Sequence, residues 1–260
     1  MYDFFAAYTY AAGALLTVLA AVIGAVLWRS PALSQGRRSM LIAALIGWPF
    51  GLFSFENIPK YWNPKVLAWL GPASPEDLVF VGGCAALTWF WAAYPLRNRL
   101  RHTALERSGQ PGPADWRAIA WRFVVGAAPG IGLAYAVGLG IHGTRVITAT
   151  LLGYALGGVL LAWLKRDCWP MMLYGGAGFA ATYLLLLKLC LTVWPGFELA
   201  WQHGLQRQVW VLGLPAHEYL WALGYGLVWP LFVAWCLGTE VVAAPREVPA
   251  RPSPTPAAPA

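Results

Sequence analysis

Residues that could donate or accept protons gather at two places in this chain, each just ahead of a long apolar segment. The candidate residues are Glu56, Glu76 and Asp77 at the first place and Glu198, His217 and Glu218 at the second. Apolar surroundings favour the neutral form of a carboxylic acid, which then keeps its proton at neutral pH. An acid in that state can protonate an alkene. Capping of a helix start is the alternative role, and for Glu76 alone it stays open.

An internal repeat relates the two places. Residues 69–80 (WLGPASPEDLVF) align with residues 210–221 (WVLGLPAHEYLW) at a constant offset of 141. In this alignment Asp77 meets Glu218, and Phe80 meets Trp221. Chance similarity between apolar segments is the alternative, but the aligned polar residues argue against it. We therefore expect the acids of the two copies to converge if the repeats pack face to face.

Aromatic residues are abundant beside the acids. The chain has 16 tryptophans, more than an interfacial belt requires, although any single one can mark the membrane interface. Aromatic faces stabilise a nearby positive charge, so this region suits an apolar substrate that reacts through a cation. The candidate substrate-binding residues are Trp62, Trp69, Trp210, Trp221 and Phe80.

The composition places these residues in a membrane protein. Hydrophobic residues make up 59% of the chain and charged residues 11%, whereas soluble domains carry roughly 25% charged residues. The net charge of +7 does not indicate nucleic acid binding, because the basic residues lie in short loops between apolar stretches. Seven stretches approach the length of a membrane span, namely residues 6–28, 40–55, 78–96, 118–139, 146–164, 171–193 and 219–237. The second is short and contains Gly-Trp-Pro-Phe at residues 47–50, so it is either broken or packed against protein.

The basic residues also predict an orientation. Thirteen of the 18 Lys and Arg residues fall in segments on one side of the membrane, and four fall on the other. The positive-inside rule then places the N-terminus outside and the C-terminus in the cytoplasm, in a bacterial inner membrane. We expect the first stretch to remain in the mature chain, because residues 1–5 lack the basic region of a signal peptide.

These observations predict an all-α, polytopic membrane protein of about seven transmembrane helices, built from a parallel three-helix repeat plus a connecting helix. Residues 1–96 would form the first repeat, residues 97–142 a basic loop and the connecting helix, and residues 143–240 the second repeat. Residues 241–260 are rich in Pro and Ala without apolar periodicity, which predicts a disordered tail.

Other chemistries find little support in the sequence. No motif for a nucleotide, a prenyl diphosphate or a di-iron centre is present, and four widely spaced cysteines indicate neither a disulfide framework nor a zinc site. His203 and His217 lack the helical spacing of a metal pair, so we expect no metal and no cofactor. Lys188 invites comparison with a retinal-binding lysine. It lies near the outer end of the sixth stretch, where its ammonium group can reach water, and the seventh stretch has no lysine.

Seven helices with a tandem acidic motif at the start of two of them resemble the lycopene cyclase domain family, of the heterodimeric bacterial and fused archaeal and fungal type. The likeness covers nearly the whole chain before the tail, and its specific part is residues 74–80 and 215–221, with residues 55–62 adding to it. The family motif is Pro-x-Glu-Glu. Here the first copy has Ser74 for Pro and Asp77 for the second Glu, and the second copy has His217 for the first Glu.

The resemblance implies an isomerase: an acid-initiated cyclisation of a linear carotenoid end group, without redox change and without a cofactor. Glu76 with Asp77 and His217 with Glu218 would be the acid–base pairs, with Glu218 the first candidate. The implied partners are a carotenoid or isoprenoid substrate and the lipid bilayer; assembly into a homo- or hetero-oligomer stays open. Since neither copy keeps the whole motif, the alternative is a non-catalytic isoprenoid-binding membrane protein or a subunit of a biosynthetic complex.

Overall fold

The computed structural model describes residues 8–28, 33–52, 62–71, 73–107, 110–140, 146–201 and 209–242. These residues form seven long helices with short strands at their ends. The helices are α2 (Thr9–Leu27), α3 (Leu33–Gly51), α5 (Pro75–Ala93), α6 (Trp116–Gly140), α7 (Val146–Leu164), α8 (Trp169–Val193) and α9 (Ala216–Leu237). Each of the seven predicted stretches corresponds to one of these helices.

The chain is an all-α polytopic membrane protein, as predicted. In the described residues, six of the long helices are long and apolar enough to cross a membrane. The remaining one, α3, has Arg37 and Arg38 in its first half. It starts at Leu33 rather than at residue 40, and it continues unbroken past Pro49. Of the two alternatives for this stretch, packing against protein is the one observed: Pro49 lies in the last turn of an unbroken helix that packs along α5.

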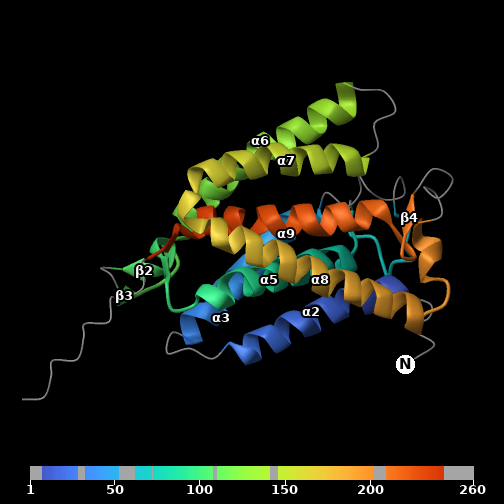
Figure 1. The fold of residues 1–260 in the computed structure, drawn as a ribbon, viewed down its shortest axis with the longest axis horizontal. Helices are drawn as coiled ribbons and strands as arrows, with labels where there is room; N and C mark the ends of the chain where they lie inside the picture. The colour runs from blue at the N-terminus through green and yellow to red at the C-terminus, as the bar shows by residue number, and fades with distance from the viewer. Residues whose placement is uncertain are drawn as a thin grey trace, which may run out of the picture.

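The helices stack in three layers (Figure 1). Helices α6 and α7 form one outer layer, α8 and α9 lie in the middle, and α2, α3 and α5 complete the other side. Glycines allow close helix contacts, as is common in membranes. A Cβ atom added at Gly226 of α9 would lie 2.9 Å from the Gly176 Cα atom of α8, and one added at Gly153 of α7 would lie 2.6 Å from the Gly130 carbonyl oxygen of α6.

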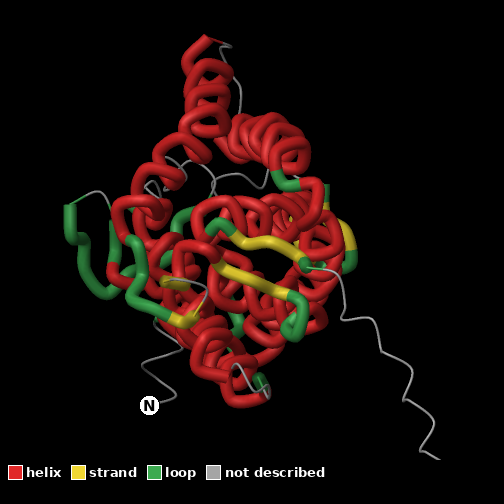
Figure 2. The backbone as a smooth tube through the Cα atoms, turned by 90° about the vertical axis from the view of Figure 1, so that its left-hand side faces the viewer, coloured by secondary structure: helices red, strands yellow, loops and turns green. Residues whose placement is uncertain are grey.

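Short strands tie together the ends of α5 and α9. Strand β1 (Leu100–His102) pairs antiparallel with β6 (Thr239–Val241), and the pair is visible at the end of the molecule that faces the viewer in Figure 2. Strands β2 (Glu106–Arg107) and β3 (Gln110–Pro111) form a small hairpin at the same end. The predicted tail therefore does not begin at Val241, because this residue pairs with Leu100; residues 243–260 lie outside the described residues.

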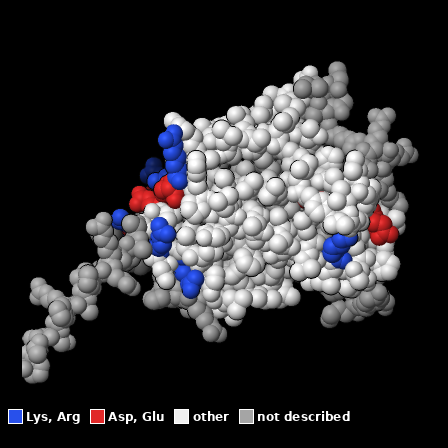
Figure 3. All heavy atoms as spheres, in the orientation of Figure 1, with Lys and Arg blue, Asp and Glu red and all other residues white. Residues whose placement is uncertain are grey.

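Charged side chains are gathered at the ends of the molecule. Figure 3 shows Lys and Arg mainly at the end where β2 and β3 lie, while the described residues over the middle of this face are uncharged. Exposed aliphatic side chains such as Leu19 and Val159 also cover the helices, being 54% and 71% exposed. An uncharged middle with charged ends matches the hydrocarbon core and the two interfaces of a bilayer.

The two aligned segments have the same local fold. Before α5 a bridge pairs Leu70 with Ala73, and before α9 the strands β4 (Trp210–Val211) and β5 (Leu214–Pro215) pair Val211 with Leu214, at the matching positions. Gly71 and Leu212 also occupy matching positions, and both have a positive φ: 72° for Gly71 and 48° for Leu212. Each copy is thus a tight hairpin that leads directly into a helix, and the helix starts place the acids of both copies at one end of the molecule.

Candidate functional site

A cavity of about 540 Å³ opens between the middle layer and the α6–α7 layer. Side chains of α2, α3, α5, α8 and α9 form one part of its wall, and glycine-rich faces of α6 and α7 form the other. Most of its lining is apolar. Within the described residues, Asp77 and Glu218 are the acids that line it, and no Lys, Arg or His does. The cavity therefore suits an apolar molecule that meets two carboxyl groups.

Asp77 is the third residue of α5 and is 1% exposed. Its Oδ2 atom accepts hydrogen bonds from the Ser74 backbone N–H at 2.7 Å and the Ser74 hydroxyl at 2.9 Å. The Ser74 hydroxyl in turn accepts from the Asp77 N–H, which completes a capping box. The Tyr10 hydroxyl of α2 donates to Oδ1 at 2.7 Å. Asp77 therefore caps its helix and lines the cavity at the same time.

Glu218 is the third residue of α9 and is 6% exposed. The Tyr183 hydroxyl of α8 donates to its Oε2 atom at 2.8 Å, and the Trp201 indole N–H donates to Oε1 at 3.0 Å. The two acids thus occupy the same position in their helices, and each accepts a hydrogen bond from a tyrosine of a neighbouring helix. The two copies share the position of the acid and its tyrosine partner, whereas the other donors differ: Ser74 donates to Asp77, and Trp201 donates to Glu218.

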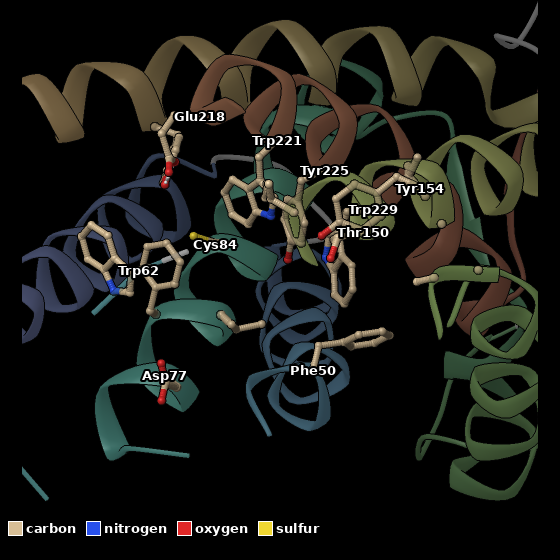
Figure 4. A pocket seen from close by; sticks show the side chains of 18 of the residues that line it. Phe50, Trp62, Asp77, Cys84, Thr150, Tyr154, Glu218, Trp221, Tyr225 and Trp229 are labelled. Atoms are coloured by element: carbon tan, nitrogen blue, oxygen red, sulfur yellow. Dashed lines mark hydrogen bonds between the residues drawn. The ribbon is translucent and has the colours of Figure 1, made fainter. Parts of the chain in front are cut away.

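Aromatic rings join the two acids. From Tyr10, which holds Asp77, ring contacts run to Trp62 at 5.7 Å and from Trp62 to Trp201 at 4.5 Å, which reaches Glu218. A second path runs from Tyr10 to Phe80 at 5.9 Å and from Phe80 to Tyr183 at 6.2 Å. Figure 4 shows Glu218 and Asp77 on opposite sides of the site with Trp62 between them. A cation formed between the acids would lie among aromatic rings.

One face of α9 continues this aromatic wall along the cavity. Glu218, Trp221, Tyr225 and Trp229 follow each other at spacings of three and four residues, which places them on one side of a helix. Trp221 stacks on Tyr225 at 5.1 Å, and Tyr225 stacks on Trp229 at 5.2 Å. Phe80 of α5 lies across from this ladder and stacks on Trp221 at 6.2 Å. The cavity therefore has an acidic end and a long aromatic side (Figure 4).

The other predicted acid–base residues lie away from the cavity lining. Glu76 is buried, but its Oε1 atom accepts the Leu67 backbone N–H at 2.6 Å in the preceding loop. His217, like Glu76, stands one position before a cavity acid, and one helical residue turns a side chain by about 100°. Glu198 is exposed and accepts the Gly196 N–H at 3.2 Å. Glu56 lies outside the described residues.

The predicted aromatic residues divide in the same way. Trp62, Phe80 and Trp221 line the cavity. Trp69 and Trp210 do not; they are 53% and 37% exposed. Both belong to the hairpins that precede the helices, so they lie at the end of the molecule rather than along the helix faces that enclose the cavity.

Several cavity residues carry no obvious signal in the sequence. Tyr10, Tyr183 and Trp201 donate to the two acids, yet in the sequence the two tyrosines are ordinary aromatic residues of apolar stretches, and Trp201 is one of many tryptophans near the acidic residues. The usable signal is a polar tip inside an apolar segment, since a buried Tyr or Trp usually finds a hydrogen-bond partner. This rule identifies tyrosines and tryptophans that need a hydrogen-bond partner, but it does not show which acid each of them contacts.

The described residues offer no alternative centre for metal or retinal chemistry. They hold no group of three His, Cys, Asp or Glu placed to bind a metal ion, and all four cysteines are buried, free thiols. The Lys188 ammonium group donates to the Leu212 carbonyl oxygen in the β4–β5 turn and does not line the cavity. Lys188 is therefore not placed to bind a retinal molecule in this cavity.

The arrangement combines two buried carboxyl groups, tyrosine hydroxyls beside them and an aromatic cavity within a membrane protein. This set can give a proton to an apolar molecule, stabilise the resulting positive charge and take a proton back. Comparison with known proteins adds no relative to this description: no protein-family model, no curated protein and no solved structure matches the chain.

Proposed function

We propose that this chain is a cofactor-independent cyclase of linear carotenoid end groups, of the lycopene cyclase type. The observation that carries the proposal is the pair of equivalent acids, Asp77 and Glu218, which face one aromatic cavity from two matching helix starts. A soluble proton donor would have no access to an alkene inside a bilayer. Two buried carboxyl groups at the mouth of an apolar cavity provide both the donor and the acceptor of protons.

The reaction we propose is an isomerisation. A carboxylic acid adds its proton to the terminal alkene, which leaves a tertiary carbocation. A neighbouring double bond attacks this cation, a new carbon–carbon bond closes the ring, and the positive charge moves onto the ring. A carboxylate then removes a ring proton to form the ring double bond. One proton enters and one leaves, so the product has the same formula as the substrate and no electron acceptor is needed.

Glu218 is the proton donor in this proposal, and Asp77 is the base. The oxygens of Asp77 accept three hydrogen bonds, two of them from Ser74 at Oδ2, so we assign the proton-accepting role to this carboxyl group. The Trp201 indole N–H donates to Oε1 of Glu218, and the Tyr183 hydroxyl donates to Oε2. Because a tyrosine hydroxyl can accept as well as donate, Tyr183 can stay bonded to Glu218 when Oε2 carries a proton.

The aromatic residues stabilise the cation in this proposal. Trp62, Phe80 and Trp221 line the space next to the acids, and an aromatic face that lies close to a cation contributes about 0.5 to 2 kcal/mol. The same rings exclude water, which would otherwise trap the carbocation as an alcohol. The aromatic residues therefore prevent the reaction of the carbocation with water and also lower the activation free energy of ring closure.

The proposed setting is a bacterial inner membrane with the N-terminus outside. Arginines at the β2–β3 end support a cytoplasmic location for that end, and the acids then lie near the outer surface. The substrate enters from the bilayer. Helix α6 supports this route for two reasons. Only 6% of the residues in its apolar, membrane-spanning part are buried, so the helix faces the lipid, and its glycines line the cavity.

A non-catalytic carotenoid-binding protein is the second candidate. The observation in its favour is that both oxygens of Asp77 and both oxygens of Glu218 already accept internal hydrogen bonds, as they would if they only fixed helix starts. The two candidates differ in one respect. The cyclase needs the carboxyl group of Glu218 for ring formation, whereas the binding protein needs only its shape and its hydrogen bonds.

The test is expression in a host that accumulates lycopene, with the parent chain beside Glu218→Gln and Asp77→Asn at matched protein levels. Chromatography and mass spectrometry of the pigments should show ringed products of unchanged mass with the parent. Glu218→Gln keeps the size of the side chain but has no acidic proton, so rings should disappear. Rings formed equally by Glu218→Gln would contradict the assigned donor, and untouched lycopene with a well-expressed parent would favour the binding protein.

A further inference from the structure

Two hydrogen-bond donors inside the cavity have no acceptor among the described residues. They are the Tyr225 hydroxyl and the Trp229 indole N–H, and each of these side chains is only 5% exposed. Both residues line the cavity. Buried polar groups in folded proteins are almost always hydrogen-bonded, because an unmet donor loses its water without compensation. The pair therefore needs an acceptor that the described part of the chain does not supply.

The two donors are placed to share one ligand. Tyr225 and Trp229 are four residues apart on α9, and their rings stack at 5.2 Å and 8°. Figure 4 shows their polar ends on the cavity side of α9, and the Tyr154 ring of α7 lies 6.2 Å from the Tyr225 ring. An oxygen atom of a molecule in the cavity would reach this place between α7 and α9 without leaving the aromatic wall.

The charge of the cavity restricts the kind of oxygen. No Lys, Arg or His lines the described cavity, while the carboxyl groups of Asp77 and Glu218 do, so an anionic group would find no counter-charge. An indole N–H can only donate, and it therefore requires an acceptor. The group that fits is a neutral oxygen, as in an alcohol, a ketone, an aldehyde or an ether.

The pair belongs to one half of the site only. The repeat matches Tyr225 with Cys84 and Trp229 with Thr88, and the Thr88 hydroxyl already donates to the Cys84 carbonyl oxygen at 2.7 Å. Tyr225 follows Glu218 by seven residues, which corresponds to about 10 Å along the helix axis. The oxygen site is thus separated from the acids by roughly two helical turns, on the α9 side.

We propose that Tyr225 and Trp229 bind a neutral oxygen atom of the substrate, so that the natural substrate is an oxygenated polyene rather than a plain hydrocarbon. The polyene part of this inference rests on the proposed function, whereas the oxygen follows from the two donors. The oxygen would lie about 10 Å or more from the carbon atoms that react at Glu218. It would fix how far the chain enters the cavity.

A matched pair of probes tests this inference by binding alone. The probes are all-trans-retinol and the hydrocarbon that carries a methyl group in place of its CH₂OH group. Affinities are measured in detergent from quenching of tryptophan fluorescence, for the parent, Tyr225→Phe, Trp229→Phe and the double variant. Tyr219→Phe is the control, because it removes a hydroxyl of α9 that donates to the Val211 carbonyl oxygen outside the cavity.

The parent and Tyr219→Phe should bind retinol about tenfold more tightly than the hydrocarbon. Each single variant should lower this preference, and the double variant should remove it, while affinity for the hydrocarbon stays within about twofold and shows that the cavity is intact. Equal affinities in the parent, a preference that survives in the double variant, or no binding of either probe would overturn the inference. Glu218→Gln should keep the preference, so a failure of the cyclase proposal is seen separately.

Discussion

At the residue scale, the two cavity acids differ in the donors around them. Asp77 accepts two hydrogen bonds from Ser74 and one from Tyr10, whereas Glu218 accepts one from Tyr183 and one from Trp201. Removing the Tyr10 hydroxyl leaves Asp77 with both Ser74 donors, whereas removing the Tyr183 hydroxyl takes away the hydroxyl that donates to Oε2 of Glu218. This difference predicts that Glu218 depends more strongly on its tyrosine than Asp77 does.

Tyr183→Phe should lower the kcat of cyclisation by about tenfold or more, with little change in KM. The side chain keeps its ring contacts, but the carboxyl group of Glu218 loses the bond that orients it, and general acid catalysis depends on that orientation. The measurement is the initial rate of ring formation by purified protein in lipid or detergent. Tyr10→Phe is the matched control at Asp77, and its effect should be smaller. A larger loss of kcat in Tyr10→Phe would reverse the roles assigned to the two acids.

The acids could be predicted from the sequence, but their partners could not. Asp77 and Glu218 stand at matching places in a repeat, so alignment of the chain with itself is enough to place both among the candidates. Tyr10 and Tyr183 have no such pattern, because which tyrosine reaches which acid depends on how α2 packs on α5 and α8 on α9. The adjacent Glu76 and His217 were chosen with the acids because a sequence motif does not show which of two neighbours faces a cavity.

At the scale of the elements, the apolar pattern predicted every long helix but not all of their ends. Helix α3 begins at Leu33, ahead of its apolar part. Its first half carries Arg37 and Arg38, so a search for apolar stretches misses this part of the helix. The short strands were not predicted either. Strands β1 and β6 are three residues long, and they pair only because the ends of α5 and α9 lie side by side.

Close helix packing predicts opposite effects for the same substitution at two glycines. Gly226→Ala should lower the free energy of unfolding by about 1 to 3 kcal/mol, since its Cβ atom would meet backbone atoms of Gly175 and Gly176 at 2.9 to 3.0 Å. Gly132→Ala in α6 meets nothing within 4 Å and should be neutral or stabilising, because alanine favours a helix. Denaturant unfolding in mixed micelles measures both. Equal destabilisation by the two would contradict the close contact of α8 with α9.

Burial of His102 predicts a pH dependence at the β1–β6 end. Desolvation lowers the pKa of His102 to about 4, and its Nδ1 atom lies 2.9 Å from the Thr239 hydroxyl. The unfolded chain then binds more protons than the folded chain between about pH 4 and 6.5, so stability is complete above that range and falls as the pH falls through it. Between pH 7.5 and 5 the loss from this group should be about 2 kcal/mol.

The matched variant is His102→Asn, which keeps a polar atom for Thr239 but does not titrate. Thermal unfolding at pH 7.5 and 5 should show a smaller difference between the two pH values for the variant than for the parent. The same difference in both proteins would mean that other groups cause the pH dependence.

At the scale of the whole molecule, the cavity is the feature that the sequence could not provide. Its walls come from all seven long helices and from two loops, which contain Trp62 and Trp201. A hydrogen bond from the Asn63 N–H to the Ala200 carbonyl oxygen, at 2.7 Å, connects these two loops. Composition predicted a membrane protein, and the repeat predicted that the acids share one end. The enclosed volume depends on side-chain packing among all these elements.

The proposed topology predicts which end of the molecule a membrane-impermeant reagent reaches from outside the cell. All four cysteines are buried, so a membrane-impermeant maleimide should react only with cysteines introduced at exposed positions. In intact bacterial cells Ala68→Cys, in the loop before α5, should be labelled, and Gln110→Cys, in β3 at the basic end, should be labelled only after lysis. The reverse pattern would place the N-terminus in the cytoplasm.

The most direct test of the central claim is single-turnover cyclisation of lycopene in D₂O, with the protein in excess, followed by mass spectrometry of the product. A proton delivered by an exchangeable carboxylic acid predicts a product with the formula of lycopene and one deuterium per ring. Glu218→Gln should form no such product. Rings without deuterium, rings formed equally by Glu218→Gln, or a product that has lost two hydrogens would contradict an acid-initiated cyclisation at Glu218.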